Sequence, residues 1–208
     1  MFKHHTTSEV NRLELALEQA ARPRRFNGII WIFWGLIFTK CFLVEYGSRV
    51  YSTGVDTATY VWSFSITMGI LCTLVYSKLT RYELLKRPIS AHLVNRIWLG
   101  CLIALMLLAV ANKWIGGIDG YLLPGIYALI LGIGFFIHGV LDRRKPFQLA
   151  ALGWWAGALG LFALNDVRAL GLFAGLIILC QILPTAWIHW AERRNLPGSG
   201  EQPEDFST

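Results

Sequence analysis

The residues of this chain whose types could do chemistry are polar side chains that lie within long apolar runs. A charged or hydrogen-bonding group is costly in hydrocarbon, so such residues mark substrate paths, proton relays or contacts between helices. Six of them are candidate site residues: Lys40, Thr67, His138, Gln181, Thr185 and His189. For Lys40, two interpretations are open. It could bind a substrate or proton, or its long stem could carry the ammonium to the membrane surface or to Glu45.

The last apolar run carries a polar stripe. Gln181, Thr185 and His189 follow one another at intervals of four residues, so they share one face of a helix. Pro184 lies within this stripe and must leave a backbone carbonyl without its helical partner. The stripe either lines a cavity or, in the interpretation we favour, hydrogen-bonds to neighbouring helices.

Three histidines, His92, His138 and His189, are expected at similar depth, near the same ends of their runs. Imidazoles in this arrangement could bind a metal or haem, and His138 could meet His189 across a bundle. Alternatively, they border the apolar layer beside arginine and lysine. The sequence has no His-Glu-x-x-His or His-x-x-His spacing. We therefore predict no metal, no cofactor and no catalytic residues, and a chain that is not an enzyme.

The elements that must position these residues are six apolar runs, each close to the ~20 residues that a ~30 Å hydrocarbon layer demands. The chain of 208 residues is 55% hydrophobic and 15% charged, against about 25% charged in a soluble domain. We predict an all-α, polytopic membrane bundle with six transmembrane helices: Phe26–Tyr46, Ala58–Ser77, His92–Ala111, Tyr121–Leu141, Phe147–Leu164 and Arg168–Trp190. The expected layout is a cytoplasmic amphipathic segment at 1–25, the transmembrane domain at 26–190 and a disordered cytoplasmic tail at 191–208.

Lysine and arginine fall almost entirely on alternate connections between these runs. The N-terminal segment, the second-to-third and fourth-to-fifth connections and the C-terminus are basic, whereas the opposite loops hold only Arg49, Lys113 and Arg168. Because lysine and arginine near helix ends stay in the cytoplasm, both termini are predicted to be cytoplasmic. The net charge of +6 is spread along membrane edges and does not form one patch on a soluble fold, so we do not expect nucleic acid as a partner.

Residues 6–22, ahead of the first run, are predicted to form a short amphipathic helix. Thr6 and Glu9 have capping-box spacing, apolar residues recur at helical intervals, and Pro23 ends the pattern. The helix either lies on the lipid headgroups or docks onto a cytosolic protein. The partners we expect are therefore membrane lipids and a cytosolic protein bound through 6–22, with a homo-oligomer also open.

Small residues predict which helices pack closely. Gly153 and Gly157 in the fifth run, and Gly171 and Gly175 in the sixth, have the small-x-x-x-small spacing that lets helices approach each other. Trp154 lies near mid-membrane, where it either fills the space beside these glycines or forms the wall of a ligand pocket.

The start of the first run carries a resemblance. Trp31-Ile-Phe-Trp34-Gly35, preceded by a charged amphipathic segment and a basic run, is similar to the start of certain small bacterial multi-pass inner-membrane proteins, as is the Arg193-Arg194 ending. Those proteins are uncharacterised, and some are thought to accompany cytoplasmic transcriptional regulators. The resemblance implies a bacterial inner membrane and assigns no functional residue.

Three functions follow from these observations. The leading hypothesis is a non-enzymatic membrane protein that senses or scaffolds, meeting a cytosolic partner or lipid. The alternative is a small-solute transporter or channel with a polar path formed by Lys40, Thr67, Gln181 and Thr185. A membrane enzyme or haem protein that uses His138 and His189 is the third.

Overall fold

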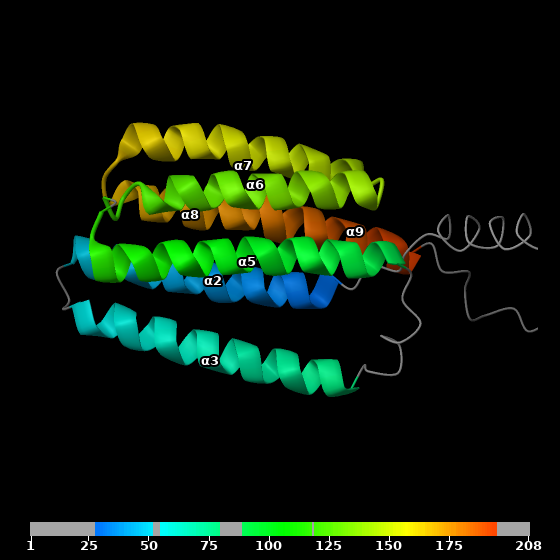
Figure 1. Cartoon of the computed structure of the whole chain (residues 1–208), viewed down its shortest axis with the longest axis horizontal. Helices are drawn as coiled ribbons and strands as arrows, with labels where there is room; N and C mark the ends of the chain where they lie inside the picture. The colour runs from blue at the N-terminus through cyan, green and yellow to red at the C-terminus, as the bar shows by residue number, and fades with distance from the viewer. Residues whose placement is uncertain (1–27, 52–54, 80–88, 118, 195–208) are drawn as a thin grey trace, which may run out of the picture.

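The computed structural model describes residues 28–51, 55–79, 89–117 and 119–194 (Figure 1). Throughout these residues the regular structure is helical, and they form no strand. The helices are α2 (Gly28–Val50), α3 (Val55–Leu79), α5 (Ile89–Ile115), α6 (Leu123–Leu141), α7 (Lys145–Leu164) and α8 (Arg168–Ile177), which continues through a π-helical turn, η1 (Ile178–Ile182), into α9 (Leu183–Arg194).

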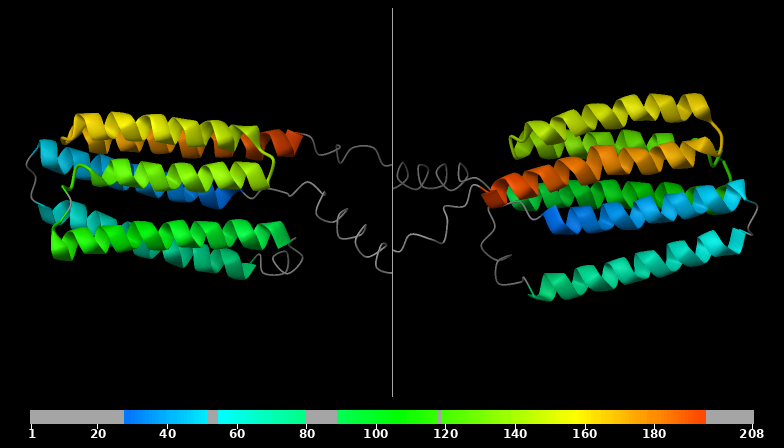
Figure 2. Two further views of the ribbon diagram at one scale, coloured as in Figure 1. Left: turned by 45° about the horizontal axis from the view of Figure 1, so that its top comes forward. Right: turned by 180° about the vertical axis from the view of Figure 1, so that it is seen from behind.

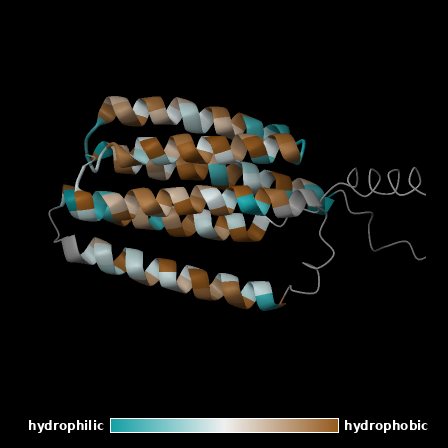
Figure 3. Cartoon of the chain, viewed as in Figure 1, coloured by the Kyte–Doolittle hydropathy of each residue, from teal (hydrophilic) through white to brown (hydrophobic). Residues whose placement is uncertain are grey.

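Six helical spans of the described chain are long and apolar enough to cross a membrane. Much of the helical ribbon in Figure 3 has the colours of hydrophobic residues, and many large apolar side chains are exposed. Such a surface suits hydrocarbon surroundings, because helices that satisfy their own backbone groups can present apolar side chains to lipid. The predicted all-helical bundle with six spans is therefore confirmed.

The end of the last span differs from the prediction. The helix continues to Arg194, so residues 191–194 extend it and do not belong to the predicted disordered tail at 191–208. Two contacts hold this last turn: Glu192 pairs with Arg144, and the Arg194 guanidinium lies 3.7 Å above the centre of the Trp190 ring. The remainder of that tail and the expected helix at 6–22 lie outside the described residues.

The spans are stacked in layers, as Figures 1 and 2 show. α7 lies at one edge of the bundle over α6 and the α8–α9 span, α2 and α5 form the next layer, and α3 lies at the opposite edge. α3 packs chiefly against α2, and α5 chiefly against α6. The α5–α6 and α7–α8 connections lie at one end of the bundle, and the α6–α7 turn lies at the other, with the start of α2 and the end of α9.

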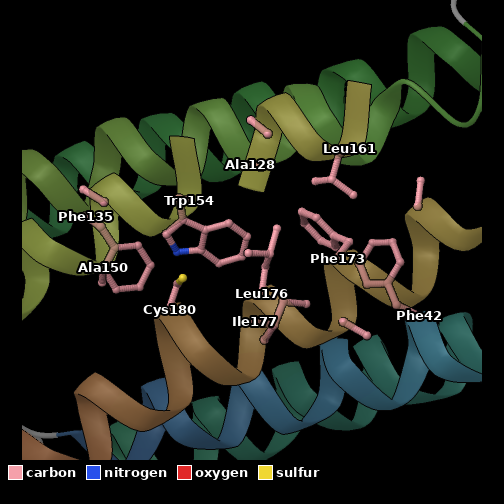
Figure 4. Close-up of a cluster of buried hydrophobic side chains, with 14 of the residues drawn as sticks. Phe42, Ala128, Phe135, Ala150, Trp154, Leu161, Phe173, Leu176, Ile177 and Cys180 are labelled. Atoms are coloured by element: carbon pink, nitrogen blue, oxygen red, sulfur yellow. The ribbon is translucent and has the colours of Figure 1, made fainter. Parts of the chain in front are cut away.

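The buried core lies between α7, α6, α8 and α2. Trp154 is fully buried at its centre, with its ring centroid 6.3 Å from that of Phe135 and 5.6 Å from that of Phe173 (Figure 4). Its indole nitrogen has no hydrogen-bond partner in the described part of the chain, so packing alone holds the ring there. Of the two roles predicted for Trp154, filling space within the bundle is the one observed.

Glycines of α7 bring that helix close to the last span, as predicted. A Cβ at Gly153 would lie 2.7 Å from the Cys180 sulfur, and one at Gly157 would overlap a leucine of α8. The glycines of α8 play no such part. A Cβ at Gly171 would come only within ordinary contact distance of α2, and one at Gly175 would meet nothing within 4 Å.

The closest-packed pair of helices, α6 and α7, depends on other glycines. A Cβ at Gly125 would lie 2.6 Å from the Phe162 ring, and one at Gly132 would overlap the Trp155 indole. Each aromatic ring of α7 therefore occupies the space that a side chain on α6 would need. This fixes the relative height of the two helices.

The polar stripe of the last span falls on a distorted helix. Across Ile178–Ile182 the chain forms a π-helical turn, closed by a bond from the Leu183 N–H to the carbonyl of Ile178. Pro184 follows directly, and its ring would crowd the carbonyl four residues before it in a regular helix. A wider turn at this point relieves that clash. The last span thus accommodates Pro184 through a π turn that the sequence did not predict.

Asp166 holds the turn between α7 and α8. Its carboxylate accepts two hydrogen bonds from Arg168, one from the backbone N–H at 2.7 Å and one from the side-chain Nε at 2.8 Å. The preceding residue, Asn165, has the left-handed conformation that ends α7. The hydrogen bond from the Arg168 side chain lowers the pKa of Asp166 below its ordinary value.

Candidate functional site

A cavity of about 310 Å³ lies within the bundle, in the half that contains the start of α6 and the end of α2. α2, α3, α5, α6 and α8 contribute to its wall. The lining is mostly aromatic and aliphatic, and it includes Phe42, Trp62, Leu105, Tyr127 and Phe173. The lining has one carboxylate, from Glu45, and one amide side chain, from Gln181. A mostly apolar cavity with a few polar groups is typical of a site for a small organic ligand. We call it the intramembrane cavity.

The intramembrane cavity opens toward the surroundings of the bundle between α3 and α5. Trp62 and Ile66 of α3 line it from one side, and Leu102 and Met106 of α5 line it from the other. Both α5 side chains are exposed. Since α3 and α5 each pack chiefly against a different helix, neither closes this side. In a bilayer, a molecule dissolved in the lipid would reach the cavity from here.

Glu45 places a negative charge at the wall of the cavity. Its Oε2 accepts a hydrogen bond from Trp62 Nε1 at 3.0 Å, and its Oε1 pairs with Arg49 Nη2 at 2.9 Å. The Arg49 guanidinium, in the last turn of α2, lies 5.6 Å from the centre of the ring of Tyr121, which precedes α6. Glu45 is therefore held in place by neighbours from α2 and α3. Charge-assisted hydrogen bonds of this kind are stronger than neutral ones.

Gln181 forms the polar part of the wall at the other end of the cavity. Its Nε2 donates a hydrogen bond to the backbone carbonyl of Trp31 at 3.1 Å, which ties the π turn to α2. Gly35 makes this approach possible, because a Cβ there would lie 2.7 Å from Ile182 Cγ1 and 3.2 Å from Gln181 Nε2. The hydrogen bond between helices that we favoured for the polar stripe is thus present at Gln181.

A histidine and an aspartate are buried together toward the other end of α6. His138 Nε2 lies 3.1 Å from Asp142 Oδ2, and both side chains are 2% exposed. Trp98 Nε1 donates to His138 Nδ1 at 3.3 Å. An indole nitrogen can only donate, so His138 Nδ1 must be the acceptor. The ring hydrogen is then on Nε2, which donates a hydrogen bond to Asp142 Oδ2. The rings of Trp31 and Phe147 lie 5.7 and 4.6 Å from the imidazole, and we call these five residues the His138 cluster.

Trp31 connects the two sites. Its backbone carbonyl accepts the hydrogen bond from Gln181 at the cavity, and its ring belongs to the His138 cluster, with its centroid 4.4 Å from that of Trp98. A movement of Gln181 would therefore act on α2, the helix that contributes Trp31 to the His138 cluster.

The structure separates the residues of the proposed polar path. Lys40 is exposed on the outer side of α2, and Glu45 is paired with an arginine of its own helix instead. Thr67 is exposed on α3, where its hydroxyl donates to the carbonyl one turn earlier at 2.8 Å. Thr185 is fully buried, and its hydroxyl has no partner among the described residues. Of these candidates, only Gln181 lines the intramembrane cavity.

The histidines are placed in different surroundings. His138 is enclosed by rings of α2, α5 and α7, whereas His189 is half-buried on α9. The side chain of His92 lies outside the part that the structure describes. Within that part, no group of three or more histidine, cysteine, aspartate and glutamate side chains is arranged to hold a metal ion.

Two acidic residues at these sites, Glu45 and Asp142, were not among the site residues predicted from the sequence. Each has a partner four residues away on its own helix, a spacing that could have drawn attention to both. The tryptophans at these sites, Trp62 beside Glu45 and Trp98 beside His138, come from other helices and are not visible from spacing. In comparisons with models of protein families, with curated proteins and with solved structures, nothing matches this chain.

Proposed function

We propose that this chain is a non-enzymatic, multi-pass membrane protein that senses an apolar molecule dissolved in the lipid. The observation that carries the proposal is the intramembrane cavity, which has an aromatic and aliphatic lining and an opening between α3 and α5. Its 310 Å³ falls within the usual range for small-molecule sites.

The lining indicates the chemistry of this molecule. An aliphatic or aromatic body would contact side chains such as Phe42, Tyr127 and Phe173, and a single hydroxyl or amino group would donate to Glu45. A hydrophilic solute would leave most of the wall without polar contacts and would lose its hydration on entry. The ligand class is therefore an apolar molecule with one donor group.

The connection through Trp31 supports a sensing role. A ligand that displaces Gln181 would weaken its bond to the Trp31 carbonyl and so loosen the contact between the π turn and α2. Because the Trp31 ring packs in the His138 cluster, the change would reach the end of the bundle that carries the α6–α7 turn. A protein bound at that end could respond to it.

The expected orientation places that end in the cytoplasm of a bacterium, at its inner membrane. In the described residues, Arg143, Arg144 and Lys145 lie at this end, as do the arginines that end α9. Arg49, Lys113 and Arg168 belong to the opposite end, and this imbalance supports the orientation.

A solute path is not the function that the geometry favours. The side chains of Lys40 and Thr67 are exposed on the outside of the bundle, while Thr185 is buried without a partner among the described residues. They do not meet at the cavity.

Binding is tested with 1-aminoanthracene, an apolar amine whose fluorescence rises in apolar surroundings. The full-length protein in detergent should bind it saturably. Ala109→Trp, which places a large ring at the cavity wall, should weaken binding at least tenfold. Ile103→Trp on the exposed side of α5 is the matched control and should bind like wild type. Equal affinity of Ala109→Trp and wild type would refute the site.

Sensing is tested by hydrogen exchange on the same full-length protein with and without saturating 1-aminoanthracene. Amides of residues 142–145 and of Phe147, at the α6–α7 turn, should change their exchange rate when the cavity is filled. Gln181→Leu should bind the probe but no longer transmit the change, since it cannot donate to Trp31. Unchanged exchange in the wild type despite saturable binding would leave a binding protein and reject the sensing role.

A further inference from the structure

A second, shallow pocket of about 270 Å³ lies at the end of the bundle where the α6–α7 turn faces α9. Its wall from the turn and the start of α7 includes Arg143, Arg144 and Lys145. Its wall from α9 includes Trp187 and Glu192. We call it the basic pocket. It is separate from the intramembrane cavity, with which it shares no lining residue.

The charges of the basic pocket are arranged for an anion. Arg144 pairs with Glu192, so this arginine fixes the distance between the turn and α9. Arg143 and Lys145 are exposed and make no ion pair with any residue that the structure describes. Two cationic side chains that flank one pocket suit the oxygens of a phosphate group.

In the turn, the backbone amides of Arg143 and Arg144 already have acceptors, so these two residues offer a ligand their side chains. Arg143 has φ 52°, a left-handed conformation that is uncommon for residues other than glycine. This conformation lets the Arg143 N–H bond to the Val140 carbonyl at 3.2 Å and the Arg144 N–H bond to the Gly139 carbonyl at 2.8 Å. The turn therefore closes α6 with the Arg143 and Arg144 amide donors used, and it leaves the Arg143 guanidinium and the Lys145 ammonium exposed.

An apolar surface adjoins the basic pocket on its membrane side. Trp187 lines the pocket and is 69% exposed, and Leu183, one turn earlier on the same face of α9, is 53% exposed. The exposed Trp190 and the three basic residues mark this end as the level where hydrocarbon gives way to water. A bound phosphate would lie at headgroup depth, and an acyl chain could run along Trp187 and Leu183.

From this combination we propose that the basic pocket binds the phosphate headgroup of an anionic phospholipid, between Arg143 and Lys145, with an acyl chain on the α9 face. Basic pockets between helices at the membrane surface recognise such headgroups. The occupant is a lipid and not free phosphate, because the exposed apolar side chains of Trp187 and Leu183 adjoin the charged groups and suit an acyl chain. The proposal does not depend on a ligand in the intramembrane cavity.

The test is a titration of the delipidated, full-length protein in nonionic detergent with dioctanoyl phosphatidylglycerol, measured by calorimetry. Each lysine or arginine near an anionic surface strengthens binding about fivefold, so Arg143→Gln/Lys145→Gln should weaken it about 25-fold. Lys78→Gln/Lys113→Gln removes the same charge from α3 and α5, away from the pocket, and should change the affinity less than twofold. Helical circular dichroism checks that all variants are folded.

Two further titrations identify the source of the phosphate. Dioctanoyl phosphatidylcholine and inorganic phosphate should each bind at least tenfold more weakly than phosphatidylglycerol. Equal binding of phosphatidylcholine would show that anionic charge is not recognised, and equal binding of inorganic phosphate would assign the pocket to a soluble anion. Either result would overturn the proposal, as would an unchanged affinity in Arg143→Gln/Lys145→Gln.

Discussion

Replacing Gly35 with alanine should loosen the contact between α2 and the π turn. The new Cβ would lie 2.7 Å from Ile182 Cγ1, and the branched Ile182 side chain has little rotational freedom with which to move away. The same Cβ would lie 3.2 Å from Gln181 Nε2, so the hydrogen bond to the Trp31 carbonyl would be strained as well.

The size of the effect follows from two contributions. Overpacking of a close contact costs about 1–3 kcal/mol. A hydrogen bond between membrane helices contributes about 0.6 kcal/mol. Gly100→Ala is the matched control, because a Cβ at Gly100 would meet nothing within 4 Å. Both variants gain the same helix propensity of up to ~1 kcal/mol. Gly35→Ala should therefore unfold with a free energy roughly 1.5–3.5 kcal/mol lower than that of Gly100→Ala.

The assay is equilibrium unfolding of the full-length protein in mixed micelles of dodecyl maltoside and sodium dodecyl sulfate, followed by helical circular dichroism. A double-mutant cycle with Gln181→Ala separates the two contributions, since the penalty of Gly35→Ala should shrink by about 0.6 kcal/mol once the amide is absent. If Gly35→Ala and Gly100→Ala differ by less than about 0.5 kcal/mol, close approach at Gly35 does not hold the two helices together.

Three further predictions concern the acidic residues and the orientation. Asp142→Ala should lower the free energy of unfolding by about 1–3 kcal/mol, because it leaves a buried imidazole N–H without its acceptor, and Asp142→Asn, which keeps an oxygen, should lose less. The hydrogen bond from Arg168 lowers the pKa of Asp166 in the folded protein. The ionised Asp166 therefore stabilises the fold fully above the pKa of an unfolded aspartate, about 3.9, and this stabilisation is lost as the pH falls through the lower pKa of the folded state. The difference in unfolding free energy between wild type and Asp166→Asn should accordingly be larger at pH 7 than at pH 3, and a constant difference would contradict this. In intact cells, an impermeant thiol reagent should label Gly117→Cys and not Arg193→Cys, and the reverse pattern would invert the orientation.

The spans were predictable from the sequence because a helix must cross a fixed thickness of hydrocarbon. The run Tyr121–Leu141, for example, differs from α6 by two residues at its start and by none at its end. Gln181 was also predictable, since a buried amide in an apolar helix needs a partner and a backbone carbonyl of a neighbour is the most available one.

The faces of the helices were not predictable for a physical reason. In a soluble protein the polar side of a helix shows which side is outward, but lipid is as apolar as the core, so nothing in the sequence showed that Thr67 lies on the outside. For Lys40, the sequence left both a site role and an outward position open. The cavity was hidden for a related reason. It is formed mostly by ordinary apolar side chains from five helices. The contacts of Trp62 with Glu45 and of Trp98 with His138 depend on the arrangement of the helices, not on spacing within one of them.

The π turn also determines which side of α9 faces the interior of the bundle. A residue added to a regular helix turns everything beyond it by about 100°, since each turn holds 3.6 residues. η1 acts as such an added residue between α8 and α9. Shortening it by one residue would rotate α9 about its axis, carry the buried Thr185 and Ile188 away from the bundle interior, and bring exposed side chains inward. A single deletion here would thus change which side of α9 faces the lipid while leaving its composition almost untouched.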